Sequence, residues 1–323
     1  MHAGRTARIS LDSSKSPERE QQLQIKPASE HVGAEITDVN LAIMPNGVFE
    51  KIEDAYNRYS LLIFRDQELS PEQQIAFARR FGELEISPRT QFALPGYPEI
   101  LVLSNIIENG KPIGNADAGR TWHTDMSYTK TPPRGSLLYA REIPIENGRA
   151  LGDTVFASAA AAFESLPRHE QASLLGLRAI HRGSAKKYAP GSKLADMIKD
   201  IPDVEHPVIR THPATGCKAI YVSEGECVGI RGMADEESLR LIKMLAELVT
   251  RPEFCYRHQW RVGDLLIWDN AMTQHLAISD YQLPLRRLMH RVTVNGSVPI
   301  SPTRHGPRTE ADSFRWQAVE GGI

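Results

Sequence analysis

Short apolar runs, rich in β-branched and aromatic residues, are spread along the whole chain, and they limit its possible folds more than any other feature. Turn-forming Pro, Gly and Asn separate the runs. This pattern favours a sandwich or jelly roll with helices packed outside over a parallel βαβ sheet. No glycine-rich dinucleotide or phosphate loop is present. The runs are residues 61–64, 100–103, 136–140, 179–181, 208–211, 219–222, 254–259, 265–268 and 288–294.

Flanking helices are predicted where the apolar spacing changes to the helical period. One is expected to begin at Pro71, with Ser70 as N-cap and Gln73 completing a capping box, and to be stopped by Gly82. Two further helical segments are residues 48–59 and residues 157–175, the latter interrupted by a proline.

A fourth helix is expected over residues 236–249, with Asp235 as its N-cap. Its apolar residues recur at helical spacing and predict one buried face. That face comprises Leu239, Ile242, Leu245, Ala246 and Val249.

The chain of 323 residues is interpreted as a disordered tail over 1–22, one domain over 23–297 and a C-terminal tail over 298–323. A net charge of −2 and a pI near 6.6 argue against binding nucleic acid or a membrane surface. No apolar run is long enough to span a bilayer, and the polar start lacks a signal-peptide core. Three cysteines, with no paired motif, favour a reducing compartment, so we expect a cytoplasmic protein.

A single His-x-Asp, His123 and Asp125, offers two metal ligands. In a strand-like segment these side chains would project from the same face. With 11 histidines in the chain, one such pair also arises readily by chance. His275 is the candidate third ligand, and two histidines with one carboxylate form the facial triad of non-heme Fe(II) oxygenases.

The last apolar run carries two arginines. Strand parity places Arg287, Met289 and Arg291 on one face, opposite Leu288 and His290. Two arginines on a buried face indicate a bound anion, whereas on an exposed face they would simply be solvated. An iron oxygenase needs a two-electron donor, and 2-oxoglutarate would engage the metal and an arginine at once. That hypothesis explains both groups of residues together.

In order and spacing, several motifs make the chain resemble the taurine dioxygenase and 2,4-dichlorophenoxyacetate dioxygenase family of Fe(II)/2-oxoglutarate enzymes. The resemblance covers about residues 32–296 and implies a double-stranded β-helix (jelly-roll) core. It also implies oxidation of a substrate C–H by O₂, with release of succinate and CO₂. The motifs are Gly33–Ile36, Ile75–Gly82, Trp122–Asp125, Gly152–Thr154, Trp268–Asn270 through His275, and Arg286–Arg291.

The resemblance also assigns roles to residues. It implies that Fe(II) binds His123, Asp125 and His275, that Thr154 and Arg287 bind the far carboxylate of 2-oxoglutarate, and that Arg291 lies near both the cosubstrate and the substrate's anionic group. His290 is interpreted as a packed strand residue. The histidines expected to be structural are His181, His206 and His212. We expect a homodimer or homotetramer.

Two departures from taurine enzymes bear on the substrate. Residues 83–89 lack the sulfonate-binding histidine of those enzymes, and Gly119 replaces their asparagine. A third departure is Leu151 in place of the first glycine of the usual Gly-Gly-Asp-Thr. We therefore expect another sulfonate, a sulfate ester or a carboxylate with a larger apolar or aromatic body. The polar segment Ser104–Thr121 is either a lid over the substrate or a surface loop without a role.

Two other functions remain compatible with the same residues. A zinc hydrolase would use the triad with a bound water and need no O₂. A non-catalytic jelly roll would bind an anionic ligand without forming succinate.

Overall fold

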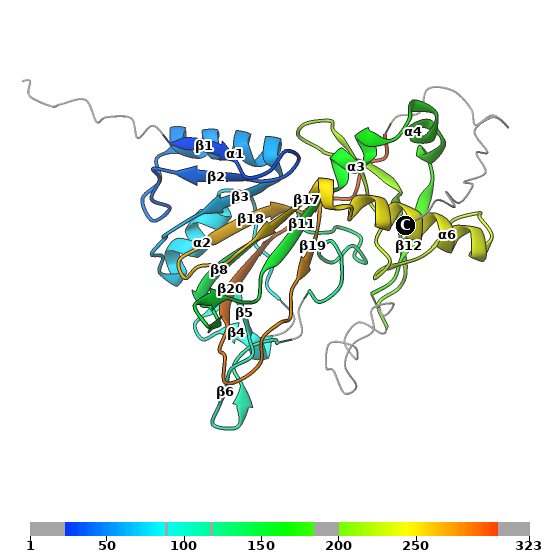
Figure 1. Ribbon diagram of the computed structural model, residues 1–323. Coiled ribbons are helices and arrows are strands. Elements are labelled where there is room, and N and C mark those ends of the chain that lie inside the picture. Colours follow the sequence, from blue (N-terminus) through cyan, green and yellow to red (C-terminus); the bar gives the residue numbers. More distant parts are fainter. Residues whose placement is uncertain (1–22, 88–89, 117–118, 184–199, 303–323) are drawn as a thin grey trace, which may run out of the picture.

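The computed structural model describes residues 23–87, 90–116, 119–183 and 200–302. Both predicted tails lie largely outside these ranges. A large sheet and a small sheet form the centre of the molecule, and a helical lobe stands beside them (Figure 1).

The large sheet has eight strands in the order β1-β2-β3-β18-β8-β20-β5-β4. All of its pairings are antiparallel except β2 with β3. Its strands are β1 (Gln24–Pro27), β2 (Ala34–Thr37), β3 (Leu61–Phe64), β18 (Leu265–Asp269), β8 (Gly135–Glu142), β20 (Leu288–Val294), β5 (Tyr97–Ser104) and β4 (Ala93–Leu94).

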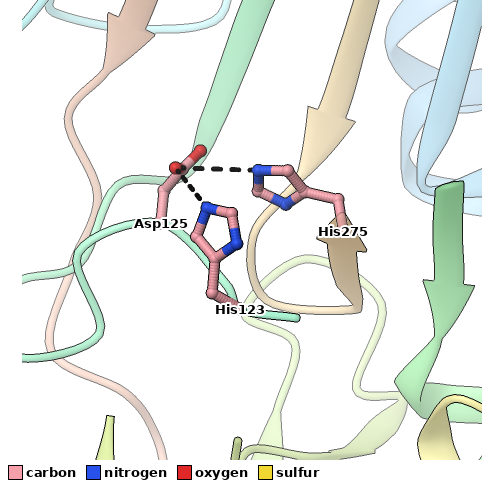
Figure 2. Close-up of side chains that lie close together, drawn as sticks. All are labelled: His123, Asp125 and His275. Atoms are coloured by element: carbon pink, nitrogen blue, oxygen red, sulfur yellow. Dashed lines mark ion pairs between the residues drawn. The ribbon is translucent and has the colours of Figure 1, made fainter. Parts of the chain in front are cut away.

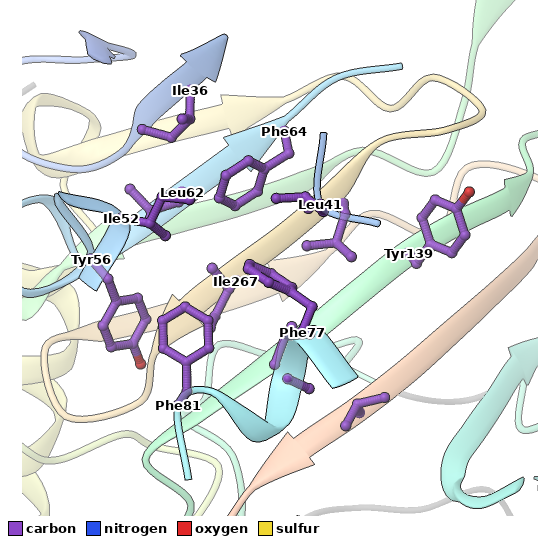
Figure 3. Packing of buried hydrophobic residues seen from close by; sticks show 14 of the residues in the cluster. Ile36, Leu41, Ile52, Tyr56, Leu62, Phe64, Phe77, Phe81, Tyr139 and Ile267 are labelled. Carbon is purple, nitrogen blue, oxygen red and sulfur yellow. The ribbon is translucent and has the colours of Figure 1, made fainter. Parts of the chain in front are cut away.

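Two helices, α1 (Asn46–Tyr59) and α2 (Pro71–Arg79), cover the outer face of this sheet. Alternate strand residues, among them Leu62 and Phe64, meet Ile52 of α1 and Phe77 of α2 (Figure 3). The capping box predicted at Ser70 is present and fixes where α2 begins.

The inner face of the large sheet packs against the small antiparallel sheet β17-β11-β19. Its strands are β17 (Cys255–His258), β11 (Thr154–Ser158) and β19 (Thr273–Ala277). Phe156 of β11 lies 5.5 Å from Trp268 of β18, between ring centroids. Two β sheets packed around one core, with helices outside, confirm the predicted jelly-roll class.

The helical lobe has its own core, formed where the helices that the structure describes there pack on short strands. Its helices are α3 (Ala159–Ser165), α4 (Arg168–Leu174) and α6 (Asp235–Val249), and its strands are β12 (Arg178–His181), β13 (Val204–Pro207), β14 (Ile209–Thr211), β15 (Lys218–Ile220) and β16 (Cys227–Ile230). The break predicted at Pro167 separates α3 from α4.

Some predicted details are wrong. Asp235 is the first helical residue of α6 rather than its cap, because Ala234 holds the extended N-cap position without a side-chain bond. Leu239 is exposed, and Leu241 and Leu248 are buried in its place. Helix α2 ends at Arg79, ahead of the expected stop at Gly82.

Short hairpins account for most of the other strands. The segment after β5 contains one, β6 (Ile107–Glu108) with β7 (Lys111–Pro112), and β9 (Ile145–Glu146) pairs with β10 (Arg149–Ala150). Brief 3₁₀ turns occupy Thr90–Phe92 and Pro252–Phe254. Among the described residues, no helix is both long and apolar enough to cross a lipid bilayer.

Candidate metal centre

The two histidines of the candidate triad come from different parts of the chain. His275 lies on β19, and His123 forms an isolated bridge with it, in which each backbone N–H donates to the other's carbonyl, at 3.2 and 2.8 Å. The sequence had indicated a strand-like segment for His123 and Asp125, and this is wrong. Only His123 is paired, in a single bridge, and a turn follows it. The three side chains nevertheless converge (Figure 2).

The Asp125 carboxylate divides its two oxygens between the histidines and a polar support. Its Oδ1 lies 3.7 Å from Nε2 of His123 and 3.8 Å from Nε2 of His275. Its Oδ2 accepts from Ser136 Oγ at 2.7 Å and pairs with the Arg291 guanidinium at 2.9 Å. One oxygen is thus left to face the two imidazoles.

The protonation states suit a divalent cation. Burial raises the pKa of the Asp125 carboxyl. The charges of Arg291, His275 and His123 and the hydrogen bond from Ser136 lower it by more, so the pKa lies well below the usual range. His123 Nδ1 lies 2.7 Å from the Thr121 carbonyl. Because a carbonyl only accepts, Nδ1 carries a hydrogen, and Nε2 is the ring nitrogen that faces Asp125 and could bind a metal.

Asn270 connects the segment that carries His123 and Asp125, here called the metal loop, to the large sheet. Its Oδ1 accepts from Trp268 Nε1 at 3.1 Å and from the Asp125 backbone N–H at 3.4 Å, and its carbonyl accepts from Thr124 Oγ1 at 2.7 Å. Sequence reasoning identified Asn270 only as part of a motif and missed Ser136 altogether. A serine in a strand carries no signal of its own.

A pocket opens beside the triad. The three residues expected to contact the cosubstrate, Thr154, Arg287 and Arg291, all line it together with His123 and His275. Its apolar wall is formed by Leu103, Leu138, Trp268 and Ile278. The pocket therefore joins a cluster of metal-ligating side chains to a cluster of anion-binding ones.

Arg287 is the most unusual of these side chains. It is only 7% exposed, its Nε has no hydrogen-bond partner, and no carboxylate in the described part of the chain pairs with it. Burial lowers the pKa of its guanidinium. The neighbouring Arg286, by contrast, is half exposed and pairs with Glu142 at 2.9 Å. The alternative of two solvated arginines is therefore wrong for Arg287.

Thr154 is oriented by an indole. Trp260 Nε1 donates to Thr154 Oγ1 at 3.0 Å, and both side chains are buried. Because an indole N–H can only donate, the threonine oxygen accepts and its own hydrogen is left to point elsewhere. Thr154 is thus prepared to donate to an anion in the pocket. Trp260 was not singled out from the sequence.

The segment Ser104–Thr121 contributes to the other side of the pocket through Asn115, Ala116, Gly119 and Arg120. The Gly119 carbonyl accepts from the Ala277 N–H at 2.8 Å. With a φ of +77°, a Cβ at Gly119 would lie 3.3 Å from Cε1 of His123. This end of the segment therefore passes directly over a candidate ligand.

The three histidines that were expected to be structural lie apart from this cluster. His181 Nδ1 is 3.0 Å from Ser127 Oγ, His206 Nε2 is 2.9 Å from the Thr129 carbonyl, and His212 Nε2 pairs with Asp269 at 2.8 Å. Each is buried. His290 is also buried, facing away from Arg291 on β20.

A jelly roll with a convergent 2-His-1-carboxylate group defines the class of non-heme Fe(II) oxygenases. The profile of the taurine catabolism dioxygenase TauD, TfdA family matches residues 24–293. The chain belongs to this family, and it is an Fe(II)- and 2-oxoglutarate-dependent dioxygenase. The resemblance read from its motifs is confirmed.

Several relatives support this assignment. The chain is 35% identical to the α-ketoglutarate-dependent 2,4-dichlorophenoxyacetate dioxygenase of Cupriavidus pinatubonensis, over 81% of this chain and 93% of the relative. It is 32% identical to an α-ketoglutarate-dependent sulfate ester dioxygenase of Pseudomonas putida, over 86% and 91%. A structure described as a putative α-ketoglutarate-dependent taurine dioxygenase from Burkholderia xenovorans matches with a TM-score of 0.74 at 34% identity, over 87% and 95%.

Proposed function

We propose that His123, Asp125 and His275 bind the catalytic Fe(II). We also propose that Thr154, Arg287 and Arg291 bind 2-oxoglutarate in the adjoining pocket. The observation that carries this proposal is the buried Arg287 guanidinium, which has no carboxylate partner among the described residues and lies in the same pocket as the triad. Burying an unpaired cation is costly, so an anionic ligand is expected there. A zinc hydrolase acting through a bound water gives this arginine no use.

The donor set fits Fe(II). Two imidazoles and one carboxylate place their ligand atoms within 4.8 Å of one another, on one side of a site that leaves other positions for small ligands. When bound, the iron supplies activation of O₂ at the expense of the cosubstrate's electrons.

The protein's own groups orient the reactants. Arg287 and Thr154 fix the far carboxylate, which sets how far the keto-acid end reaches toward the triad. Arg291 and Ser136 hold Oδ2 of Asp125, so that Oδ1 keeps its direction toward the imidazoles. Leu103, Leu138 and Ile278 exclude water from the reacting end of the pocket.

We further propose that the primary substrate is a small anion, either a sulfonate other than taurine, a sulfate ester or a carboxylate, with an apolar or aromatic body. The named relatives act on 2,4-dichlorophenoxyacetate and on sulfate esters. In this chain, the exposed Arg120 and the largely buried Arg291 both line the pocket, together with its apolar wall. Hydroxylation at a carbon bearing oxygen or sulfur would release an aldehyde or ketone and a leaving group.

The test is substrate-dependent release of succinate by the purified protein with Fe(II), O₂ and 2-oxoglutarate. A panel of aryloxyalkanoates, alkyl sulfates and sulfonates is compared with taurine. We expect release with at least one larger anion, and a taurine kcat/KM below roughly 10⁴ M⁻¹s⁻¹. Turnover of a hydrolysable ester without O₂ would favour a zinc hydrolase. Anion binding without release of succinate would favour a non-catalytic jelly roll that only binds an anion.

We also propose that residues 23–297 form the catalytic domain and that the enzyme works in the cytoplasm as a homodimer or homotetramer. The family match lies within that range, and Cys217, Cys227 and Cys255 are all free thiols, which supports a reducing compartment. Size-exclusion chromatography with light scattering tests the assembly. A monomer at micromolar concentration would contradict it.

A further inference from the structure

Next to Arg287 in the pocket lies Tyr281, a side chain that the sequence analysis did not single out. It lines the same pocket as Thr154 and Arg287. The Arg287 guanidinium carbon lies 5.9 Å from the centroid of the Tyr281 ring and 6.0 Å from that of Trp260. Two aromatic rings therefore flank the buried cation.

The Tyr281 ring is held in place by the turn that precedes β11. The Gly152 N–H donates to Asp280 Oδ1 at 2.8 Å, and the Ile278 N–H donates to the Asp153 carbonyl at 2.8 Å. A Cβ at Gly152 would lie 2.8 Å from Cε1 of Tyr281 and 3.1 Å from Nε of Arg287. The ring and the guanidinium thus rest against the same glycine, and neither has room to move toward it.

The direction of the hydrogen bonds leaves the Tyr281 hydrogen available. Tyr281 lies beside the Arg287 guanidinium, 5.9 Å from ring centroid to guanidinium carbon, and it raises the pKa of the arginine against the effect of burial. Because a guanidinium only donates, the tyrosine oxygen can only accept from it, and the hydroxyl hydrogen cannot be used in that contact. Within the described ranges, no acceptor for the Tyr281 hydroxyl hydrogen is found. The hydroxyl hydrogen of Thr154 is available in the same way, since Trp260 donates to the Thr154 oxygen.

We propose that the Tyr281 hydroxyl is a third donor to the far carboxylate of 2-oxoglutarate, beside Arg287 and Thr154. This proposal rests on the proposed function. A carboxylate offers about four lone-pair sites, so one guanidinium edge and one threonine leave a site for a further donor. Three donors fixed by Gly152, Trp260 and Asp280 make the pocket selective for a dicarboxylate of this length.

The experiment compares wild type with Tyr281→Phe, which removes the hydroxyl and keeps the ring against Gly152. Two ligands are titrated anaerobically with Fe(II), following the visible charge-transfer band. They are 2-oxoglutarate and 2-oxopentanoate, in which a methyl group replaces the far carboxylate. Losing a hydrogen bond to a charged group predicts an affinity for 2-oxoglutarate lower by about 10- to 100-fold. The affinity for 2-oxopentanoate should not change.

A matched control is Tyr97→Phe, since that hydroxyl contacts Glu72 on the surface. It should leave both affinities at the wild-type value. If Tyr281→Phe binds 2-oxoglutarate as tightly as wild type, the ring only packs on Arg287 and the proposal is overturned. Equal weakening of both ligands also overturns it, because the far carboxylate is then not the group recognised. If wild type itself does not bind 2-oxoglutarate, the cosubstrate assignment fails instead.

Discussion

At the scale of single residues, the pocket depends on the difference between two adjacent arginines. Arg286 reaches the surface and pairs with Glu142, whereas Arg287 turns inward, is buried and pairs with no carboxylate of the residues that the structure describes. Its backbone is held by the end of β5 and the residue that follows it: Ser104 Oγ donates to the Arg287 carbonyl at 2.7 Å, and the Arg287 N–H donates to Asn105 Oδ1 at 2.9 Å. The buried charge is therefore fixed before any ligand arrives.

This pair of arginines gives a direct test of the cosubstrate site. Removing one partner of a desolvated charge pair costs about 2–5 kcal/mol, so Arg287→Ala should weaken 2-oxoglutarate binding by roughly 30- to several-thousand-fold. The affinity of Arg287→Lys for 2-oxoglutarate should lie between those of wild type and Arg287→Ala, because lysine keeps the charge but cannot form the bidentate hydrogen bond. Arg286→Ala is the control and should bind normally. Equal affinity in wild type and Arg287→Ala, by anaerobic titration, would remove Arg287 from the site.

At the scale of elements, the turn that precedes β11 contacts two of the side chains that line the pocket. Gly152 has a φ of +78° and is in close contact with Tyr281 and Arg287. Gly148 in the β9–β10 hairpin has nearly the same φ, +77°, but a Cβ there would meet nothing within 4 Å. The two glycines therefore share a backbone requirement and differ in their surroundings.

Substituting each glycine by alanine separates these effects. Both variants should lose about 1–2 kcal/mol of unfolding free energy through the left-handed backbone. Gly152→Ala should in addition displace Tyr281 or Arg287 and weaken 2-oxoglutarate binding at least tenfold, since either displacement loses a bond to the carboxylate. Chemical denaturation and ligand titration measure the two quantities. A Gly152→Ala protein with wild-type affinity would show that the turn does not shape the site.

Elements with strong local signals were predictable and those defined by tertiary pairing were not. Helices α1 and α2 and strand β20 follow from spacing, caps and apolar runs within their own residues. Strands β11 and β19 were missed, because Thr154–Ser158 and Thr273–Ala277 mix polar and apolar residues and become strands by pairing with each other. The triad and the arginines could be named from motifs, but Ser136, Trp260 and Tyr281 could not, since their roles depend on which atoms face them.

At the scale of the whole molecule, the metal loop lies between the jelly roll and the helical lobe. Just after Asp125, Ser127 hydrogen-bonds both Glu226 and His181 of the lobe. Beside His275, Gln274 Nε2 donates to the Val222 carbonyl at 2.7 Å. The lobe therefore supports the back of the loop that carries two candidate ligands.

Buried neutral histidines in this arrangement make the fold sensitive to acid. Burial lowers the pKa of His181 to about 3, and burial together with the charge of Arg141 lowers the pKa of His290 to about 4. In the unfolded chain both would titrate near 6.5. As the pH falls below about 6.5, the unfolded state takes up protons that the folded state does not, so the free energy of unfolding should decrease.

The magnitude can be isolated at His290. One such group contributes up to about 1.4 kcal/mol per pH unit between its two pKa values. His290→Gln should therefore show a shallower loss of unfolding free energy than wild type between pH 6.5 and 5, by about 1 kcal/mol per pH unit. The measurement is urea unfolding of the metal-free protein at several pH values, with the exposed His169→Gln as control. A His290→Gln slope equal to that of wild type would mean that His290 accepts a proton in the folded protein as readily as in the unfolded chain.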